Sequence, residues 1–390
     1  MKHIVLPLSF FLLIFFQSCS KKREVQLFDS GQIIPVEFNT NRYLPLDSFI
    51  DNVTVIPLET NDSCLIRQLV LQVKEHQGLI YLNNFMRQLL VFDMKGNFIR
   101  EIGRRGQGPG EFLEVRDFLF TNENTIEILD FKKIEHYTLD GKYIETVKKF
   151  DYIGKEFYFN PMSFCRSYSK GYYLWGGMLH GGNEKLLESG YLMYRVNKDI
   201  QIEAGFFDKK YGDGGNMDRF KYYQDKILIT LSSLNYNIYQ INQNDSLNIR
   251  YTFDFGKYGY EIKEDFDRKT VPIENYISGI RYFQETDDFL YFNFSYQKII
   301  HCLLYSKTTG QTYIKSLAPS ENEKEIRLFP ADAIYKDQLV ALVEPFVLKM
   351  DLERMSPENI KKWGLEDFLK LDDEDNPVLI LYKTKIGYLQ

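Results

Sequence analysis

The chain has 390 residues, and its 54 acidic and 48 basic side chains give a formal charge of −6 and a pI of about 5.6. This balance offers no broad basic surface to nucleic acid, and 44% hydrophobic with 26% charged residues fit neither wholesale disorder nor a polytopic membrane protein. Aromatic residues make up 16% of the chain, with 31 Phe and 28 Tyr but 2 Trp, a composition that favours a β-rich fold.

The first eighteen residues have the pattern of a signal peptide. A short basic start precedes an apolar run from Ile4 to Phe16, which is shorter than the ~20 residues of an ordinary membrane-spanning helix. The run ends at Ser18-Cys19, and a small residue before a cysteine resembles the bacterial lipoprotein signal, in which the thiol is lipidated. We therefore expect residues 1–18 to be removed and Cys19 to anchor the protein in a membrane. An ordinary secretory signal with an incidental cysteine is the alternative.

The segment after Cys19 is polar and irregular in pattern as far as about Asp51. It contains no sustained apolar periodicity, so we expect residues 19–51 to form a lipidated N-terminus and a tether. The other cysteines, Cys64, Cys165 and Cys302, form no CxxC unit. They are expected to be buried small hydrophobes, with one long-range disulfide as the alternative.

A hairpin pattern recurs six times after the tether. The clearest copies are Leu89–Ile99 and Ile134–Ile144, in which an apolar run, a glycine-containing turn and a second alternating run follow one another. Each copy has an aromatic residue at a corresponding place; these residues are Phe92, Tyr137, Tyr194, Tyr239, Tyr305 and Tyr382. The shorter spacings between them match one four-stranded propeller blade of about 40–50 residues, and the longer spacings indicate blades with insertions.

Two further strand-like runs precede each hairpin, so each unit has four strands except the last. The last unit supplies three strands before the chain ends, and the extended segment Asn52–Pro57 is left over before the first unit. That segment can serve as the missing outer strand, which would close the ring and remove an open edge. The sequence therefore predicts an all-β, six-bladed β-propeller over residues 52–390.

Three stretches carry a family resemblance. Residues Phe98–Phe112 (FIREIGRRGQGPGEF) look like the inter-blade signature of NHL-repeat propellers. Together with Ile56–Thr60 and Asp375–Leu379, they resemble the six-bladed β-propeller lipoproteins of Bacteroidota-type bacteria. The resemblance covers most of residues 50–390 and implies the fold, but it implies no activity.

The resemblance also bears on location. In that bacterial group, surface-exported lipoproteins tend to carry acidic residues directly after the lipidated cysteine. Here Lys21, Lys22 and Arg23 follow instead. We therefore expect a lipid anchor in the cell envelope, on the periplasm-facing side of the outer membrane.

The long connections between strands are predicted to gather on one face of the propeller. In a blade with strands a to d, numbered outwards, the b-to-c and d-to-a connections emerge on the same side. They include the loop Arg104–Glu111 and the insertions Trp175–Ser189, Asp208–Met217, Gly256–Ile277 and Pro345–Asn376. The last insertion contains a helix start, with Ser356 as the cap and Pro357 at the first helical position. Because binding residues concentrate on long loops of rigid scaffolds, this face is the expected functional face.

The candidate ligand contacts lie on these connections. Arg104, Arg105 and Gln107 belong to a glycine-rich loop in which guanidinium groups and backbone amides could hold a carboxylate or phosphate. The same glycines would also serve a purely structural inter-blade turn. The remaining candidates are Trp175, His180 and Asp213. The sequence assigns no catalytic residue, metal ligand or cofactor.

The leading functional hypothesis is a non-catalytic lipoprotein that uses the loop face to bind a small molecule, a glycan or a protein. It would contact the membrane through its lipid and would not bind nucleic acid. One alternative is a propeller enzyme of NHL type, such as a metal-assisted lyase or hydrolase, which requires several convergent His, Asp or Glu side chains. The other is a glycan-binding accessory protein, which requires aromatic platforms flanked by carboxylates.

Overall fold

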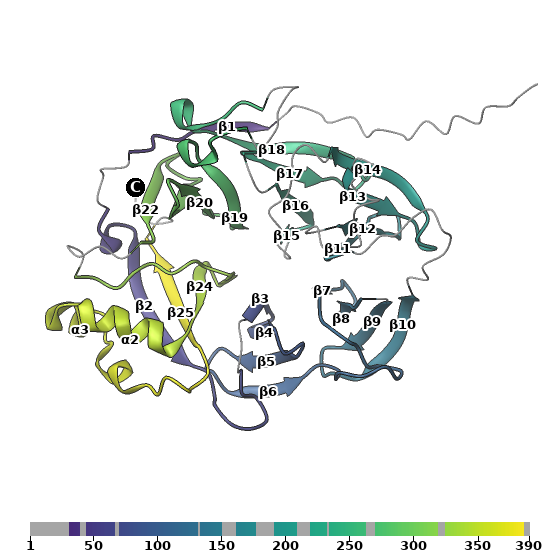
Figure 1. Cartoon of the computed structure of the whole chain (residues 1–390), viewed down its shortest axis with the longest axis horizontal. Coiled ribbons are helices and arrows are strands. Elements are labelled where there is room, and N and C mark those ends of the chain that lie inside the picture. The colour runs from purple at the N-terminus through teal and green to yellow at the C-terminus, as the bar shows by residue number, and fades with distance from the viewer. Residues whose placement is uncertain are drawn as a thin grey trace, which may run out of the picture.

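The computed structural model describes residues 31–39, 44–66, 70–131, 133–149, 161–176, 191–208, 219–231, 234–262, 270–318 and 324–385. Their strands form six sheets that surround a common axis as the blades of a propeller (Figure 1). The predicted all-β, six-bladed fold is therefore confirmed. Within these ranges, no helix is long and apolar enough to cross a membrane.

Blades 1 to 5 each run from an innermost to an outermost strand in chain order. Blade 1 consists of β3 (Val70–His76), β4 (Leu79–Asn84), β5 (Leu89–Asp93) and β6 (Phe98–Glu101). Blade 2 consists of β7 (Asp117–Phe120), β8 (Thr125–Leu129), β9 (Lys133–Thr138) and β10 (Tyr143–Lys149). Blade 3 consists of β11 (Ser163–Arg166), β12 (Tyr172–Trp175), β13 (Tyr191–Val196) and β14 (Ile202–Asp208).

Blade 4 consists of β15 (Phe220–Tyr223), β16 (Lys226–Thr230), β17 (Asn237–Ile241) and β18 (Leu247–Asp254). Blade 5 consists of β19 (Ser278–Glu285), β20 (Phe289–Tyr296), β21 (Ile299–Ser306) and β22 (Thr312–Ser316). The six aromatic residues of the recurring hairpins all lie on third strands and are all buried, with Phe92 and Tyr382 fully inaccessible. Five of them, all but Tyr194, belong to apolar clusters that join two neighbouring blades, which explains why the pattern repeats with the blade.

Blade 6 closes the ring with a strand from the other end of the sequence. Its inner strands are β23 (Ala333–Tyr335), β24 (Gln338–Val343) and β25 (Val378–Thr384), and its outer strand is β2 (Ile50–Pro57). β2 runs antiparallel to β25, with Val53 opposite Tyr382. The predicted closure by the N-terminal segment is thus confirmed, and no edge of β25 is left unpaired.

The described part of the expected tether is more ordered than the sequence indicated. β1 (Gln32–Pro35) pairs in parallel with β18 and forms a fifth strand at the outer edge of blade 4. Farther along, the short helix η1 (Leu46–Ser48) and Phe49 place two fully buried apolar side chains against blades 5 and 6. The expectation of an irregular tether is corrected for residues 31–39 and 44–51, because these apolar residues bind the segment to the ring.

The long insertion of blade 6 contains two α-helices, α2 (Pro345–Arg354) and α3 (Pro357–Lys362), and the 3-10 helix η5 (Glu366–Lys370). The predicted cap of α3 is confirmed, since the Ser356 hydroxyl accepts a hydrogen bond from the Asn359 amide at 3.2 Å. Helix α2 was not predicted. The insertion packs on the ring through buried side chains that include Leu348 and Trp363.

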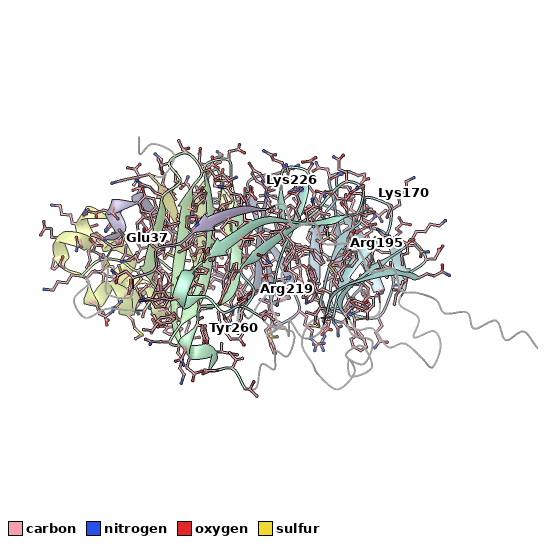
Figure 2. All side chains as sticks on the ribbon, turned by 90° about the horizontal axis from the view of Figure 1, so that it is seen from above. Glu37, Lys170, Arg195, Arg219, Lys226 and Tyr260 are labelled. Carbon is pink, nitrogen blue, oxygen red and sulfur yellow. The ribbon has the colours of Figure 1, made fainter. Side chains whose placement is uncertain are left out.

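The two faces of the ring differ in their connections (Figure 2). The turns between first and second strands and between third and fourth strands lie on one face, here the hairpin face, where the figure labels Lys170 and Lys226. The b-to-c and d-to-a connections lie on the other, here the insertion face, where the figure labels Arg219 and Tyr260. The long connections that the structure describes, among them η3 (Gly256–Tyr258) and the helical insertion of blade 6, therefore lie on one face, as predicted.

Candidate functional site

On the insertion face, the glycine-rich loop is held closed by its own carboxylate. The Glu111 side chain accepts a hydrogen bond from Arg104 Nε at 2.8 Å and another from the Gly108 amide at 2.9 Å. The Gly108 amide, and after it the Arg104 side chain, hold the pKa of the Glu111 carboxyl below its usual value. Glu111 therefore already occupies part of the place where the sequence suggested an external anion.

The backbone of this loop also serves the turn itself. The Phe112 amide donates to the Arg104 carbonyl at 3.1 Å, and the Gly106 amide donates to the Phe112 carbonyl at 2.9 Å. Gly103 has a φ of +63°, a left-handed conformation that favours glycine. Arg105 and Gln107 are exposed beside this closed turn. The structure thus places the three exposed loop candidates together, with Arg104 held in the ion pair to Glu111 and with Arg105 and Gln107 outside it.

The remaining sequence candidates are not brought together by the described residues. Trp175 is fully buried between blades 3 and 4, where its ring lies 6.0 Å from Phe207 and 5.2 Å from the Arg219 guanidinium carbon. His180 and Asp213 lie outside the described residues, as does Cys19. Ligand-binding roles for Trp175, His180 and Asp213, and lipidation of Cys19, stay predictions.

A cavity of about 760 Å³ lies on the opposite side, the hairpin face. The inner turns of three consecutive blades form it: Thr121 and Asn122 from blade 2, Ser167, Tyr168, Lys170 and Gly171 from blade 3, and Gln224 and Asp225 from blade 4. Its volume falls in the range of about 300–1,000 Å³ that is usual for ligand pockets. This cavity is a candidate site that the structure adds to those predicted from the sequence.

The blade 3 wall of the cavity is fixed by a buried carboxylate from blade 4. Asp245, in the turn between β17 and β18, accepts hydrogen bonds from the amides of Tyr168 and Ser169, both at 3.1 Å. It also accepts one from the Tyr173 hydroxyl at 3.0 Å, and its side chain is 4% exposed. Because three donors converge on one buried anion, the blade 3 turn is held in one conformation.

A second buried carboxylate organises the blade 2 side. Arg166, which lines the cavity, contacts Glu127 at 2.7 Å and Glu123 at 2.9 Å. The Tyr172 hydroxyl donates to Glu127 at 3.1 Å, and burial, followed by the Glu127 charge, raises the pKa of Tyr172 well above its usual value. The hydroxyl therefore stays protonated as a donor. The charge of Arg166 is matched within the protein by these two acids.

The blade 4 rim carries an exposed aromatic ring among polar groups. Tyr222 is 51% exposed, although it lies on the innermost strand of its blade. Three residues later in the chain, Asp225 accepts a hydrogen bond from Gln243 Nε2 at 3.0 Å and lies 3.4 Å from Lys226 Nζ. The Tyr168 hydroxyl donates to the Asp225 carbonyl at 2.5 Å and joins the blade 3 and blade 4 turns.

A smaller cavity of about 500 Å³ continues from this rim towards the outer hairpin of blade 4. The two cavities share Tyr168, Asp225 and Gln243. Amide side chains dominate the second cavity: Gln240, Asn242, Gln243 and Asn244. The two together form an elongated groove lined by polar and aromatic side chains, here the hairpin-face groove.

Residues 31–383 match the family described as "Domain of unknown function (DUF4934)". The chain belongs to this family. A crystal structure of a Bacteroides fragilis protein that is predicted to be exported is similar to this DUF4934 chain, with a TM-score of 0.72 and 18% identity over 91% of this chain and 100% of that one. A crystal structure of a DUF4221 family member from Bacteroides vulgatus has a TM-score of 0.50 and 10% identity, over 86% and 98% of the two chains. Both likenesses show the fold, and no curated protein matches significantly.

In the described ranges of this DUF4934 propeller, no three His, Cys, Asp or Glu side chains form a group that could hold a metal ion. The cysteines Cys64, Cys165 and Cys302 are free and buried. Burial raises the pKa of each thiol. All three therefore behave as core residues, as the sequence suggested, and no disulfide joins them.

Proposed function

We propose that this DUF4934 protein is an exported, non-catalytic binding protein whose ligand lies in the hairpin-face groove. The observation that carries the proposal is the cavity of about 760 Å³, whose walls are polar and aromatic and are held by the buried acids Asp245 and Glu127. Rigid walls reduce the entropy that binding costs, which is a feature of built sites. The proposal moves the binding site from the insertion face to the hairpin face.

Two contacts argue for this move. On the insertion face, Arg104 is paired with Glu111 and Trp175 has no exposed surface with which to contact a ligand, so that of these loop candidates Arg105 and Gln107 are exposed outside an ion pair. On the hairpin face, Tyr222 and Lys170 are exposed at the cavity, and Lys170 has no partner among the described residues. The hairpin face therefore offers an exposed lysine, Lys170, and a half-exposed aromatic ring, Tyr222, at a cavity.

We further propose that a lipid on Cys19 holds the protein at the periplasm-facing outer membrane. The apolar run that ends in Ser18-Cys19 and the basic residues that follow support this location. The fold similarity to a Bacteroides fragilis protein that is predicted to be exported is consistent with export. Cells fed labelled palmitate should label the wild type but not a Cys19→Ala variant, and equal labelling would remove the anchor from the proposal.

The binding function is tested by a thermal-shift screen of the full-length chain against mixed small molecules, glycans and peptides. Compounds that stabilise the wild type should stabilise Tyr222→Ala much less. A Tyr143→Ala variant is the matched control, because Tyr143 is 39% exposed on the outer strand β10, away from the groove. Compounds that stabilise the Tyr222→Ala and wild-type proteins equally would place the ligand elsewhere.

A further inference from the structure

We infer that the hairpin-face groove binds an uncharged oligosaccharide; this inference rests on the proposed binding function and names its ligand class. Three properties of the groove carry it, namely its charge balance, the kind of polar groups that line it and its elongated shape.

The first property is charge. The cations at the groove are Arg166, Lys170 and Lys226. The carboxylates at the groove or paired with these cations are Glu123, Glu127 and Asp225. The numbers of the two signs are equal, and two of the cations are already in ion pairs. An anionic ligand would need an excess of cations, so the balance favours a neutral ligand.

The second property is the chemistry of the lining. Each side-chain amide can both donate and accept, as each sugar hydroxyl can. The Gln243 carbonyl oxygen and the Asn244 side-chain nitrogen have no partner among the described residues, and both side chains are exposed. Tyr222 adds a half-exposed ring at the same groove, and the negative face of an aromatic ring attracts the C–H face of a sugar.

The third property is shape. The groove crosses three inner turns and continues into the second cavity of about 500 Å³. Tyr168, Asp225 and Gln243 lie where the two cavities meet. A single sugar would leave much of this space empty, whereas a linear chain of several sugars can contact Tyr222 and the amides of the outer hairpin together.

The test is calorimetric titration of the full-length chain, purified in a detergent without a sugar headgroup. The probes are neutral oligosaccharides (cellohexaose, xylohexaose, mannohexaose, maltohexaose and chitohexaose), an acidic oligogalacturonate and a polar peptide of similar length. At least one neutral oligosaccharide should bind. Its affinity should stay within about twofold between roughly 0.05 and 0.5 M salt, because no charge is neutralised on binding.

Variants in the first cavity and at the junction of the two cavities should weaken that binding. Loss of the ring in Tyr222→Ala should lower the affinity by about two- to tenfold, and loss of the amide in Gln243→Ala by a similar factor. Tyr222→Trp keeps an aromatic platform and should retain binding, which separates stacking from a folding defect. Tyr143→Ala should bind as the wild type does.

Different results would overturn the proposed binding site and the proposed ligand class. If the oligogalacturonate or the peptide binds, with salt-dependent affinity that Tyr222→Ala lowers, the groove is the site but the ligand class is wrong. If a neutral oligosaccharide binds and neither groove variant weakens it, the groove is not its site. If no probe binds the wild-type chain, the oligosaccharide inference is overturned, while the broader screen against Tyr222→Ala still decides the binding function.

Discussion

The insertion face and the hairpin face each carry a turn that one carboxylate holds in place, and the two carboxylates differ in burial. Glu111 engages Arg104 and the Gly108 amide with a side chain that is 20% exposed, whereas Asp245 accepts three hydrogen bonds with a side chain that is 4% exposed. Water can replace the partners of the first carboxylate but not those of the second. The short inner turn of blade 3 is therefore held more firmly than the longer glycine-rich loop of the insertion face.

The largest effect is expected from removing the buried carboxylate, Asp245. Asp245→Ala leaves the amides of Tyr168 and Ser169 and the Tyr173 hydroxyl without their acceptor, so we expect a loss of about 3 kcal/mol in the free energy of unfolding. Glu111→Ala should cost clearly less, because solvent reaches that site. Urea unfolding of the two variants measures both changes. Equal losses would mean that the two turns are held equally well.

Removing the helix cap of α3 on the insertion face should have an intermediate effect on the free energy of unfolding. Ser356→Ala removes the acceptor of the Asn359 amide at the start of α3, and such caps contribute about 1 kcal/mol. Chemical unfolding measures the loss, and Ser356→Asp, which keeps an acceptor, should restore most of it. A loss of more than about 2 kcal/mol that Ser356→Asp does not restore would show that Ser356 supports the ring in another way.

Acid should weaken an aromatic cluster on the insertion face by a smaller amount. His301 is stacked on Phe294 with ring centres 5.3 Å apart, and Phe38 meets it edge-on at 5.2 Å. Burial holds the pKa of His301 below its usual value. The unfolded chain therefore takes up a proton at a pH where the folded chain does not, and stability falls as the pH drops below about 6.5 towards the lowered pKa.

A variant without a titrating ring measures this contribution. The difference in unfolding free energy between about pH 7.5 and about pH 5.5 should be smaller for His301→Phe than for the wild type. His76, which stacks on Phe120 on the hairpin side, provides the control position for the same substitution. An unchanged or larger pH dependence in His301→Phe would contradict the assignment.

The smallest expected effect concerns the arginines of the insertion face. Arg104→Ala/Arg105→Ala removes one exposed ion pair and one exposed side chain, so the free energy of unfolding should change by less than about 1 kcal/mol. Thermal unfolding measures this change. Lys95→Ala/Lys142→Ala, two lysines beside hairpin turns, is a matched control of equal charge. Unfolding of the arginine variant alone would show that the loop supports the ring.

The sequence predicted those parts of the fold that repeat. The buried aromatic residues from Phe92 to Tyr382 marked the six hairpins, and the missing strand of blade 6 identified Asn52–Pro57 as the closing strand, which the structure extends to Ile50–Pro57. β1 was missed because the strands β15 to β18 already complete blade 4, so the strand count of that blade did not indicate a fifth strand. Helix α2 was missed because its apolar residues lie on both of its sides, with Leu348 and Leu352 buried but Phe346 and Met350 exposed.

The hairpin-face groove could not be predicted for a different reason. Its walls come from turns of blades 2, 3 and 4, each of which contains the polar residues that any β-turn contains. Asp245 appears in the sequence as one more turn residue, and only the neighbouring blade shows that it holds Tyr168 and Tyr173. The exposure of Tyr222 on an innermost strand would have been the signal, but strand order alone does not reveal it.

The most direct test of the central claim compares the two faces with one ligand. The dissociation constant of a ligand identified in the screens would be measured by calorimetry for the wild type, for Tyr222→Ala/Gln243→Ala on the hairpin face and for Arg104→Ala/Arg105→Ala on the insertion face. We predict that the hairpin-face variant binds about four- to a hundredfold more weakly and that the arginine variant binds as the wild type does. Loss of binding in the arginine variant, with full affinity in the hairpin-face variant, would contradict the account.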